Sequence, residues 1–348
     1  MHEPFSPALQ KKEEPIFLDK NENPFRLPPS LREEIRQIVS SIDLNRYPDP
    51  EAKGLKQALS EMTGIPAKSI VVGNGGDEIL TMLFEAFVEA GAKVVSLSPT
   101  FSQYPELCRR HKAEWVKVPL NIGPDEIALD EELFLNTVEK CSPALVLVDS
   151  PNNPTGLSLK ESFVDRLLEV APGVVVVDEA YGEFADRTFL EGLRNRPPQG
   201  KVCVLKTLSK AWGMAGLRLG YAACSSEVAE KLESVRDLYN VGLFAQEVAP
   251  VVLQYREWMD SRVLSIRYMR NQLIRTINRI KGYHAFPSES NFVLVRADIP
   301  AEILRGNMEE ENIFVKFVQV DAPGNWLRVS IGKEDELGRL VNALQNCV

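Results

Sequence analysis

Apolar residues occur in short, uninterrupted runs over the first two thirds of the chain. The runs are rich in β-branched residues and do not alternate with polar ones, and they cover 69–72, 93–97, 144–148, 173–177, 202–205 and 219–222. A strand with one face in water alternates apolar and polar positions, whereas a strand covered on both faces is apolar throughout. The runs therefore predict a central sheet that is buried on both sides.

Helical patterns lie between several of these runs. Apolar residues recur with helical spacing in 79–87 and again in 163–168. Strand, helix and strand at this spacing indicate an α/β domain with a largely parallel sheet. In such sheets, ligands bind at the carboxyl ends of the strands. The polar residues that follow each run are therefore the candidates for a functional site.

The pattern changes at about residue 245. A long helical stretch over 247–281 precedes strand-like runs at 291–296, 313–315 and 326–330, and a last helix is expected from Glu334. This order predicts a smaller α+β domain. The proline-rich start, which contains "NENPFRLPP", predicts an extended arm. We therefore expect an arm over 1–29, a large domain over 30–244 and a small domain over 245–348.

Composition and charge narrow the functional classes. The chain has 348 residues, 44% of them hydrophobic, and a net charge of −9, which disfavours nucleic acid and acidic membrane surfaces as partners. No apolar stretch approaches the ~18 residues of a membrane helix, and the polar start does not resemble a signal peptide. Five scattered cysteines without a Cys-x-x-Cys pair and three distant histidines predict a cytoplasmic protein without a metal site.

Two strand ends carry turns that could bind a polar ligand. The first, "GNGGDEIL" (73–80), places Gly75 and Gly76 before a helix whose first amides are free to bind an anion. It lacks the lysine of a P-loop and the third glycine of a dinucleotide fingerprint, and a simple turn capped by Asp77 is the alternative. The second, "DSPNNPTG" (149–156), is a turn in which Asn153 could present its amide to a ligand.

A third strand end carries an acidic group. In "DEAYGEF" (178–184), Asp178 directly follows four valines, and a buried carboxylate is costly unless it is paired. A protonated heterocyclic nitrogen would be one such partner, with Tyr181 close to the same place. An ordinary ion pair with another side chain is the alternative.

The fourth strand end is the most informative. In "KTLSKAWGMAGLRLG" (206–220), Thr207, Ser209 and Arg218 are suited to a phosphate, and Lys210 stands among them. Partial desolvation and the nearby arginine favour a neutral lysine amine, which attacks carbonyl groups to form a Schiff base. A phosphate cradle, an amine for an aldehyde and a carboxylate for a ring nitrogen together predict pyridoxal 5'-phosphate (PLP) as cofactor.

With these motifs in place, the chain resembles the class-II aminotransferases of fold type I. The resemblance runs nearly from end to end and rests on "NENPF", "NRYPDP", "GNGGDEIL", "SPTFSQY", "SPNNPTG", "VVDEAYGEF", "TLSKAWGMAGLRLGY", "SNFVLVR" and "LRVSIG". It implies a large domain with a mainly parallel sheet, a smaller α+β domain and a homodimer with shared active sites.

The resemblance also implies roles for individual residues. Lys210, Asp178 and Tyr181 would be catalytic: the lysine binds the coenzyme and moves a proton, the aspartate holds the ring nitrogen protonated, and the tyrosine contacts the phenolic oxygen. The remaining coenzyme contacts would be Tyr47 from the second subunit, Gly76, Asp77, Phe101, Asn153, Thr207, Ser209 and Arg218. The substrate contacts would be Phe5, Asn21, Lys316 and Arg328.

Two departures from the family pattern lie on the substrate side. Lys316 in "IFVKF" stands where the family usually has arginine, and Phe5 stands where it usually has tyrosine. The resemblance implies amino-group transfer between L-histidinol phosphate and the 2-oxo acid 2-oxoglutarate. Decarboxylation of threonine phosphate, transfer from aromatic amino acids, a nucleotide-binding dehydrogenase and a non-catalytic PLP-binding module are the alternatives. The dehydrogenase lacks its glycine fingerprint, and a non-catalytic module would be expected to have lost Lys210 or Asp178.

Overall fold

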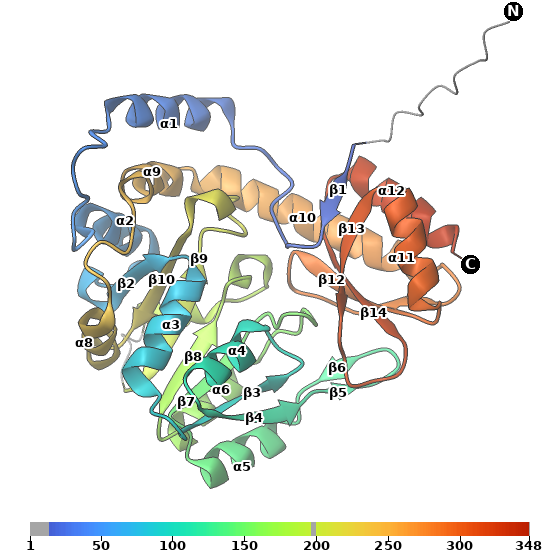
Figure 1. Ribbon diagram of the computed structural model, residues 1–348, viewed down its shortest axis with the longest axis horizontal. Coiled ribbons are helices and arrows are strands. Elements are labelled where there is room, and N and C mark those ends of the chain that lie inside the picture. Colours follow the sequence, from blue (N-terminus) through green and yellow to red (C-terminus); the bar gives the residue numbers. More distant parts are fainter. Residues whose placement is uncertain (1–13, 196–199, 348) are drawn as a thin grey trace, which may run out of the picture.

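The computed structural model describes residues 14–195 and 200–347, which form a large α/β unit and a smaller unit with its own sheet (Figure 1). Phe5 therefore lies outside the described residues. None of the helices in these two ranges is both long and apolar enough to cross a membrane.

The large unit contains a seven-stranded sheet in the order β2-β10-β9-β8-β7-β3-β4. All pairs are parallel except those of β10, which runs antiparallel to both of its neighbours. The strands are β2 (Ile70–Asn74), β3 (Lys93–Ser98), β4 (Glu114–Pro119), β7 (Leu145–Asp149), β8 (Val174–Asp178), β9 (Val202–Thr207) and β10 (Leu219–Cys224). Every apolar run predicted as a strand is present, and the edge strand β4 was not predicted.

The central strands are buried on both faces, as their sequences predict. In β8, Val174 and Val176 belong to one apolar cluster, whereas Val175 and Val177 belong to the cluster on the opposite face. Helices and short 3₁₀ turns connect and cover the strands: α1 (Pro29–Ser41), α2 (Lys53–Thr63), η1 (Ala67–Ser69), α3 (Gly76–Phe87), α4 (Gln103–Arg110), α5 (Glu131–Cys141), α6 (Glu161–Val170), η2 (Gly182–Phe184), α7 (Phe189–Asn195), η3 (Ala215–Leu217) and α8 (Ser226–Val235).

The second sheet has five strands in the order β1-β13-β14-β12-β11. Its strands are β1 (Ile16–Leu18), β11 (Tyr283–Ala285), β12 (Phe292–Ala297), β13 (Ile313–Val318) and β14 (Asn325–Ser330). Three helices belong to the same part of the chain: α10 (Arg256–Ile277), α11 (Ala301–Glu310) and α12 (Glu334–Gln345). In Figure 1, α11 and α12 lie beside this sheet, away from the large unit.

Two details differ from the elements that the sequence pattern predicts. The expected single helix over 247–281 is two helices, because α9 (Leu243–Gln254) ends at Tyr255, where α10 begins. Part of the expected arm is a strand, because β1 pairs in parallel with β13. Ile16 and Leu18 alternate with Phe17 and are buried, so one face of this edge strand packs into the core. The division into an arm and two domains at residues 29 and 244 stays a prediction.

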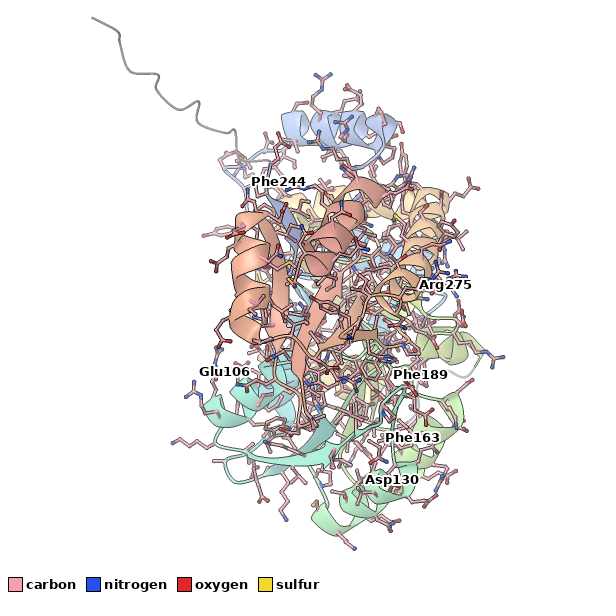
Figure 2. All side chains as sticks on the ribbon, turned by 90° about the vertical axis from the view of Figure 1, so that its right-hand side faces the viewer. Glu106, Asp130, Phe163, Phe189, Phe244 and Arg275 are labelled. Carbon is pink, nitrogen blue, oxygen red and sulfur yellow. The ribbon has the colours of Figure 1, made fainter. Side chains whose placement is uncertain are left out.

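A small hairpin of the large unit reaches the second sheet. Strands β5 (Asn121–Ile122) and β6 (Ile127–Ala128) lie beside β14 in Figure 1. Ile122 and Ile127 pack against a buried cluster of Phe286, Leu294 and Trp326. Figure 2 views the molecule from the side of the second sheet, and there Asp130 and Phe163 mark the end of the large unit opposite α1. The hairpin thus joins the two units through apolar contacts.

Candidate active site

A pocket lies at the carboxyl ends of β7, β8 and β9, where the sequence predicts it. It has a volume of about 170 Å³ and is partly open to solvent. Its lining contains ten of the predicted site residues together with four others: Gly76, Asp77, Leu80, Phe101, Asp149, Asn153, Asp178, Ala180, Tyr181, Leu205, Thr207, Ser209, Lys210 and Arg218.

Asp178 ends β8 inside this pocket and is buried, with 6% of its surface exposed. Its Oδ1 accepts a hydrogen bond from the backbone N–H of Ala180 (3.0 Å), and its Oδ2 accepts one from the hydroxyl of Tyr104 (2.9 Å). Burial raises the pKa of this carboxyl, and the two hydrogen bonds act against that rise. No described lysine or arginine forms an ion pair with Asp178, so the site has room for a cationic group of a ligand.

Two residues of this region were missed by the sequence analysis. Tyr104 lies in the recognised stretch 98–104, but nothing in the sequence indicated that its hydroxyl contacts Asp178. Asp149 ends β7 directly beside Asp178 in the parallel register. Burial raises the pKa of Asp149 to about 7, although Thr100, Asn152 and the Asn153 amide all donate hydrogen bonds to it. The sequence signal that could have identified Asp149 is its position directly after four apolar residues, at the end of a predicted strand.

The predicted anion cradle is assembled from two strand ends. Helix α3 begins at Gly76, so its first amides are without helical partners and are available to an anion. Thr207 and Ser209 hydrogen-bond to each other through their hydroxyls (2.9 Å), and Arg218 donates to Asp77 (3.0 Å). Gly75 has a φ of 80°, and a Cβ there would lie 2.4 Å from the guanidinium of Arg218. A larger residue at position 75 would strain the backbone and displace that arginine.

Lys210 and Tyr181 face each other across the pocket. The Lys210 amine lies 5.6 Å from the centre of the Tyr181 ring and donates a hydrogen bond to the carbonyl of Lys20 (2.9 Å). Tyr181 is buried, and its ring packs edge-on against Phe292 of the second sheet at 5.1 Å. The amide Nδ2 of Asn21 donates to its hydroxyl oxygen (2.9 Å). The segment after β1 therefore contacts two of the three predicted catalytic side chains, Lys210 and Tyr181.

Strand β14 brings Arg328 to the same pocket. Its guanidinium donates to Asn153 Oδ1 (2.6 Å) and to the carbonyl of Asp19 (2.5 Å), while its Nε has no hydrogen-bond partner in the described chain. Burial lowers the pKa of Arg328. Lys316 on β13 is the direct antiparallel neighbour of Arg328. Directly opposed residues project from the same face of a sheet, so the two cations are adjacent.

A buried ion cluster supports the chain just beyond Asp178. The Lys206 amine lies 3.0 Å from Glu183 and 3.7 Å from Glu179, and both Lys206 and Glu179 are almost fully buried. Glu179 also accepts hydrogen bonds from the backbone amides that begin α7. Lys206 and Glu179 alternate with Thr207 and Asp178 along their strands, so the cluster lies behind the pocket and ties β8 to β9.

One predicted coenzyme residue does not line the pocket. Tyr47 is 80% exposed and stacks on Tyr239 with ring centres 4.6 Å apart. Phe101 does line it, and its ring packs edge-on against Tyr104. Asn21 is only 1% exposed and is bonded at both ends of its side chain.

The donor set fits a phosphorylated pyridine aldehyde. Free helix amides, two hydroxyls and Arg218 can hold a phosphate, Asp178 can pair with a ring cation, and Lys210 offers an amine. The crowding of Arg218 against Gly75 supports this fit, because it aims a guanidinium at the free amides of α3. No group of three or more His, Cys, Asp or Glu side chains in the described residues could hold a metal ion.

Comparison with known proteins agrees with this geometry. The model of the family "Aminotransferase class I and II" matches residues 13–344. A histidinol-phosphate aminotransferase of Chromobacterium violaceum is 37% identical over 95% of this chain and 91% of its own. One of Caldanaerobacter subterraneus subsp. tengcongensis is 35% identical over 94% of this chain and 92% of its own.

A solved structure extends the likeness to three dimensions. The crystal structure of histidinol-phosphate aminotransferase from Sinorhizobium meliloti in complex with pyridoxal-5'-phosphate has a TM-score of 0.86 and 28% identity, covering 95% of this chain and 90% of that one. The predicted family and fold class are thereby confirmed. The chain belongs to the class I and II aminotransferase family.

Proposed function

We propose that this protein is a PLP-dependent aminotransferase that moves an amino group between L-histidinol phosphate and 2-oxoglutarate in histidine biosynthesis. The observation that carries the substrate assignment is the adjacent pair of Arg328 and Lys316, which places two cations beside a pocket lined by Lys210 and Asp178. The relatives named above, which share most of their length with this chain, support the same assignment.

The coenzyme would lie with its phosphate at the start of α3 and its ring nitrogen toward Asp178. The amides of Gly76 and Asp77, the hydroxyls of Thr207 and Ser209, and Arg218 would hold the phosphate. Phe101, which lines the pocket, would cover one face of the ring. Bound there, PLP supplies an electron sink that makes the α-hydrogen of the amino substrate acidic.

The side chains of this protein have separate tasks around that group. The carboxylate of Asp178 would hold a proton on the ring nitrogen, because a buried negative charge favours the cationic partner. The amine of Lys210 would bind the coenzyme and then carry the proton that leaves the substrate carbon. Tyr181 and Asn153 would donate hydrogen bonds to the phenolic oxygen. Closure of the pocket by the segment after β1 would keep water away from these groups.

The substrate side favours a phosphate over a single carboxylate. Arg328 can grip a planar anion with two parallel hydrogen bonds, as the α-carboxylate of glutamate requires. A phosphate carries more charge, and the exposed Lys316 next to Arg328 supplies a second cation for it. Lysine acts as a point charge, so its share is expected to be smaller and more sensitive to salt.

We propose further that the enzyme is a cytoplasmic homodimer in which Tyr47 completes the coenzyme site of the partner. Tyr47 is exposed and does not line the pocket of its own chain, which supports a contact with a second one. The described cysteines are all unpaired, which supports a reducing compartment. Mixing inactive Lys210→Ala and Tyr47→Ala chains should restore part of the activity in mixed dimers. Full activity of a monomer would contradict this proposal.

The substrate assignment is tested with half-reactions of the PLP-loaded protein. L-histidinol phosphate, L-glutamate, L-phenylalanine and L-threonine phosphate are each mixed with the protein in single turnovers, and the coenzyme absorbance is followed. We expect the highest kcat/KM for L-histidinol phosphate and amino transfer to 2-oxoglutarate. A higher kcat/KM for L-phenylalanine, or release of carbon dioxide from L-threonine phosphate, would overturn the assignment in favour of an aromatic aminotransferase or a decarboxylase.

A further inference from the structure

Asn21 occupies a special position between the two sheets. It follows β1 and has a φ of 54°, a left-handed conformation that asparagine tolerates better than most residues. Its side chain is 1% exposed and lies between Tyr181 of the large unit and Ser330 of β14. Its own carbonyl accepts a hydrogen bond from Asn291 at the start of β12 (3.0 Å). A backbone held in a costly conformation by this many partners indicates a defined task.

The hydrogen bonds around Asn21 form a directed chain from Ser330 to Tyr181. The backbone N–H of Asn21 can only donate, and it does so to the hydroxyl oxygen of Ser330 (2.8 Å). The Ser330 hydroxyl in turn donates its proton to the side-chain oxygen of Asn21 (3.0 Å). With the oxygen of the amide facing Ser330, the opposite end is the NH₂ group. The NH₂ group then donates to the hydroxyl oxygen of Tyr181 (2.9 Å).

Because of this chain of hydrogen bonds, the hydroxyl proton of Tyr181 is available to a ligand in the pocket. The Tyr181 oxygen already accepts from Asn21, and within the described residues its hydroxyl donates to no acceptor. The ring is held by Phe292 and the residue lines the pocket. A tyrosine arranged in this way offers a hydrogen-bond donor to a negatively charged oxygen of a ligand.

We propose that Asn21 is a positioning residue that keeps Tyr181 a hydrogen-bond donor toward the phenolic oxygen of the coenzyme, with Ser330 setting the orientation of the Asn21 amide. This rests on the proposed function. It gives Asn21 a task other than the direct substrate contact expected from the resemblance. Ser330 lies two residues after Arg328 on β14, so the strand that carries the substrate arginine also sets the donor state of Tyr181.

The proposal is tested by titrating the absorbance of the PLP-loaded protein with pH. A donor to a negative oxygen favours the form with more negative charge there, so it lowers the pH midpoint of the bound chromophore. Asn21→Asp keeps the shape and the left-handed backbone but cannot donate, and Tyr181 must then donate to the new carboxylate. We expect the midpoint to rise by about one pH unit, as the loss of one hydrogen bond to a charged group predicts.

The substitution Asn21→Asp also adds a negative charge. Repeating it in a Tyr181→Phe background separates the effect that passes through the Tyr181 hydroxyl, here called the relay, from the effect of that charge. The charge of the aspartate acts in both backgrounds, whereas the effect through the hydroxyl exists only when Tyr181 is present. We therefore expect a clearly smaller rise in the Tyr181→Phe background. Equal rises in the two backgrounds, or no rise in either, would overturn the proposal while leaving the proposed function intact.

Two further variants keep the proposal testable if Asn21→Asp does not fold. Ser330→Ala leaves Asn21 in place but frees its amide to turn over, so a smaller rise of the midpoint is expected and an unchanged midpoint would contradict the relay. Asn21→Gly accepts the same φ and serves as the control for backbone strain, with thermal unfolding of the coenzyme-free protein as its readout. A wild-type protein without any coenzyme absorbance tied to Lys210 would instead overturn the proposed function itself.

Discussion

The two sides of the pocket are built in different ways. On the coenzyme side, Asp178 and Thr207 stand at the ends of adjacent parallel strands, and Ser209 and Lys210 follow within three residues. On the substrate side, Asn21 and Ser330 are hydrogen-bonded although they lie 309 positions apart in the chain. The first side is made of local motifs on one sheet, and the second is assembled from distant segments of another.

The difference teaches which parts of the site tolerate change. Coenzyme chemistry needs several groups at once around one small molecule, and the strand ends of a rigid sheet hold them in place. The substrate side uses groups on or beside a second sheet. Some of them, such as Asn21 and Arg328, hydrogen-bond to residues that line the pocket, whereas Lys316 is exposed on β13. We therefore expect variants of Lys210 and Asp178 to lose most or all of the activity, and a variant of Lys316 to change the substrate preference.

The sharpest test of the coenzyme side is Lys210→Ala. We expect no measurable turnover and no coenzyme absorbance typical of a lysine linkage, because no other described amine lines the pocket. Borohydride reduction of the wild type should fix the coenzyme to Lys210 alone, as read by peptide mass spectrometry. Lys210→Arg keeps the charge but not the nucleophile and should be equally inactive. Labelling of a different lysine would disprove the assignment.

The next largest effect is expected from Asp178→Asn. The amide cannot hold a proton on the ring nitrogen, so we expect kcat to fall roughly a thousandfold, within the range of general acid–base effects. Thermal unfolding should change little, because burial already disfavours the ionised carboxyl. The exposed Asp165 on α6 provides the matched control, and Asp165→Asn should keep full activity. Normal turnover of Asp178→Asn would mean that the ring nitrogen has another partner.

Asp149 tests the electrostatics of the same side. Because burial raises its pKa to about 7, the folded coenzyme-free protein keeps a proton there between about pH 4 and pH 7, whereas the unfolded chain has released it. The free energy of unfolding therefore falls as the pH rises through this range. In Asp149→Asn that loss is absent, so its stability relative to wild type should increase by roughly 3 kcal/mol between about pH 4.5 and pH 8. Urea unfolding at several pH values measures it, and parallel curves for the two proteins would refute the raised pKa.

The smallest and most selective effect is expected on the substrate side. Lys316→Ala should raise KM for L-histidinol phosphate by about tenfold, equivalent to roughly 1.4 kcal/mol, and should change KM for glutamate much less. Arg328→Ala should impair both half-reactions severely, because both substrates present an anion to it. Lys281→Ala, at an exposed lysine outside the pocket, is the control. Equal effects of Lys316→Ala on the two substrates would show that the phosphate is held elsewhere.

Much of the coenzyme side could be predicted from local patterns. A run of four valines can only be a buried strand, and a charged residue directly after it must lie at the sheet edge, so Asp178 was predictable from its neighbours alone. The same reasoning led to Lys210, Thr207 and Ser209, which follow β9. Parallel strands then bring their ends together without further information, since all of their carboxyl ends lie at one edge.

Contacts between distant segments were decided only by the tertiary structure. The hydroxyl of Tyr104 on Asp178, the pairing of β1 with β13 and the place of Asn21 between Tyr181 and Ser330 depend on how the two sheets pack. No local sequence pattern signals the hydrogen bond between Asn21 and Ser330, which are 309 positions apart. Each of them is an ordinary polar residue within its own stretch of sequence. The sequence by itself thus predicted the central strands, the family and the proposed coenzyme groups through local burial patterns and short motifs. The hydrogen bonds of Asn21 and the pairing of Lys316 with Arg328 were decided only by the tertiary structure, because they form when the second sheet assembles and packs against the large unit.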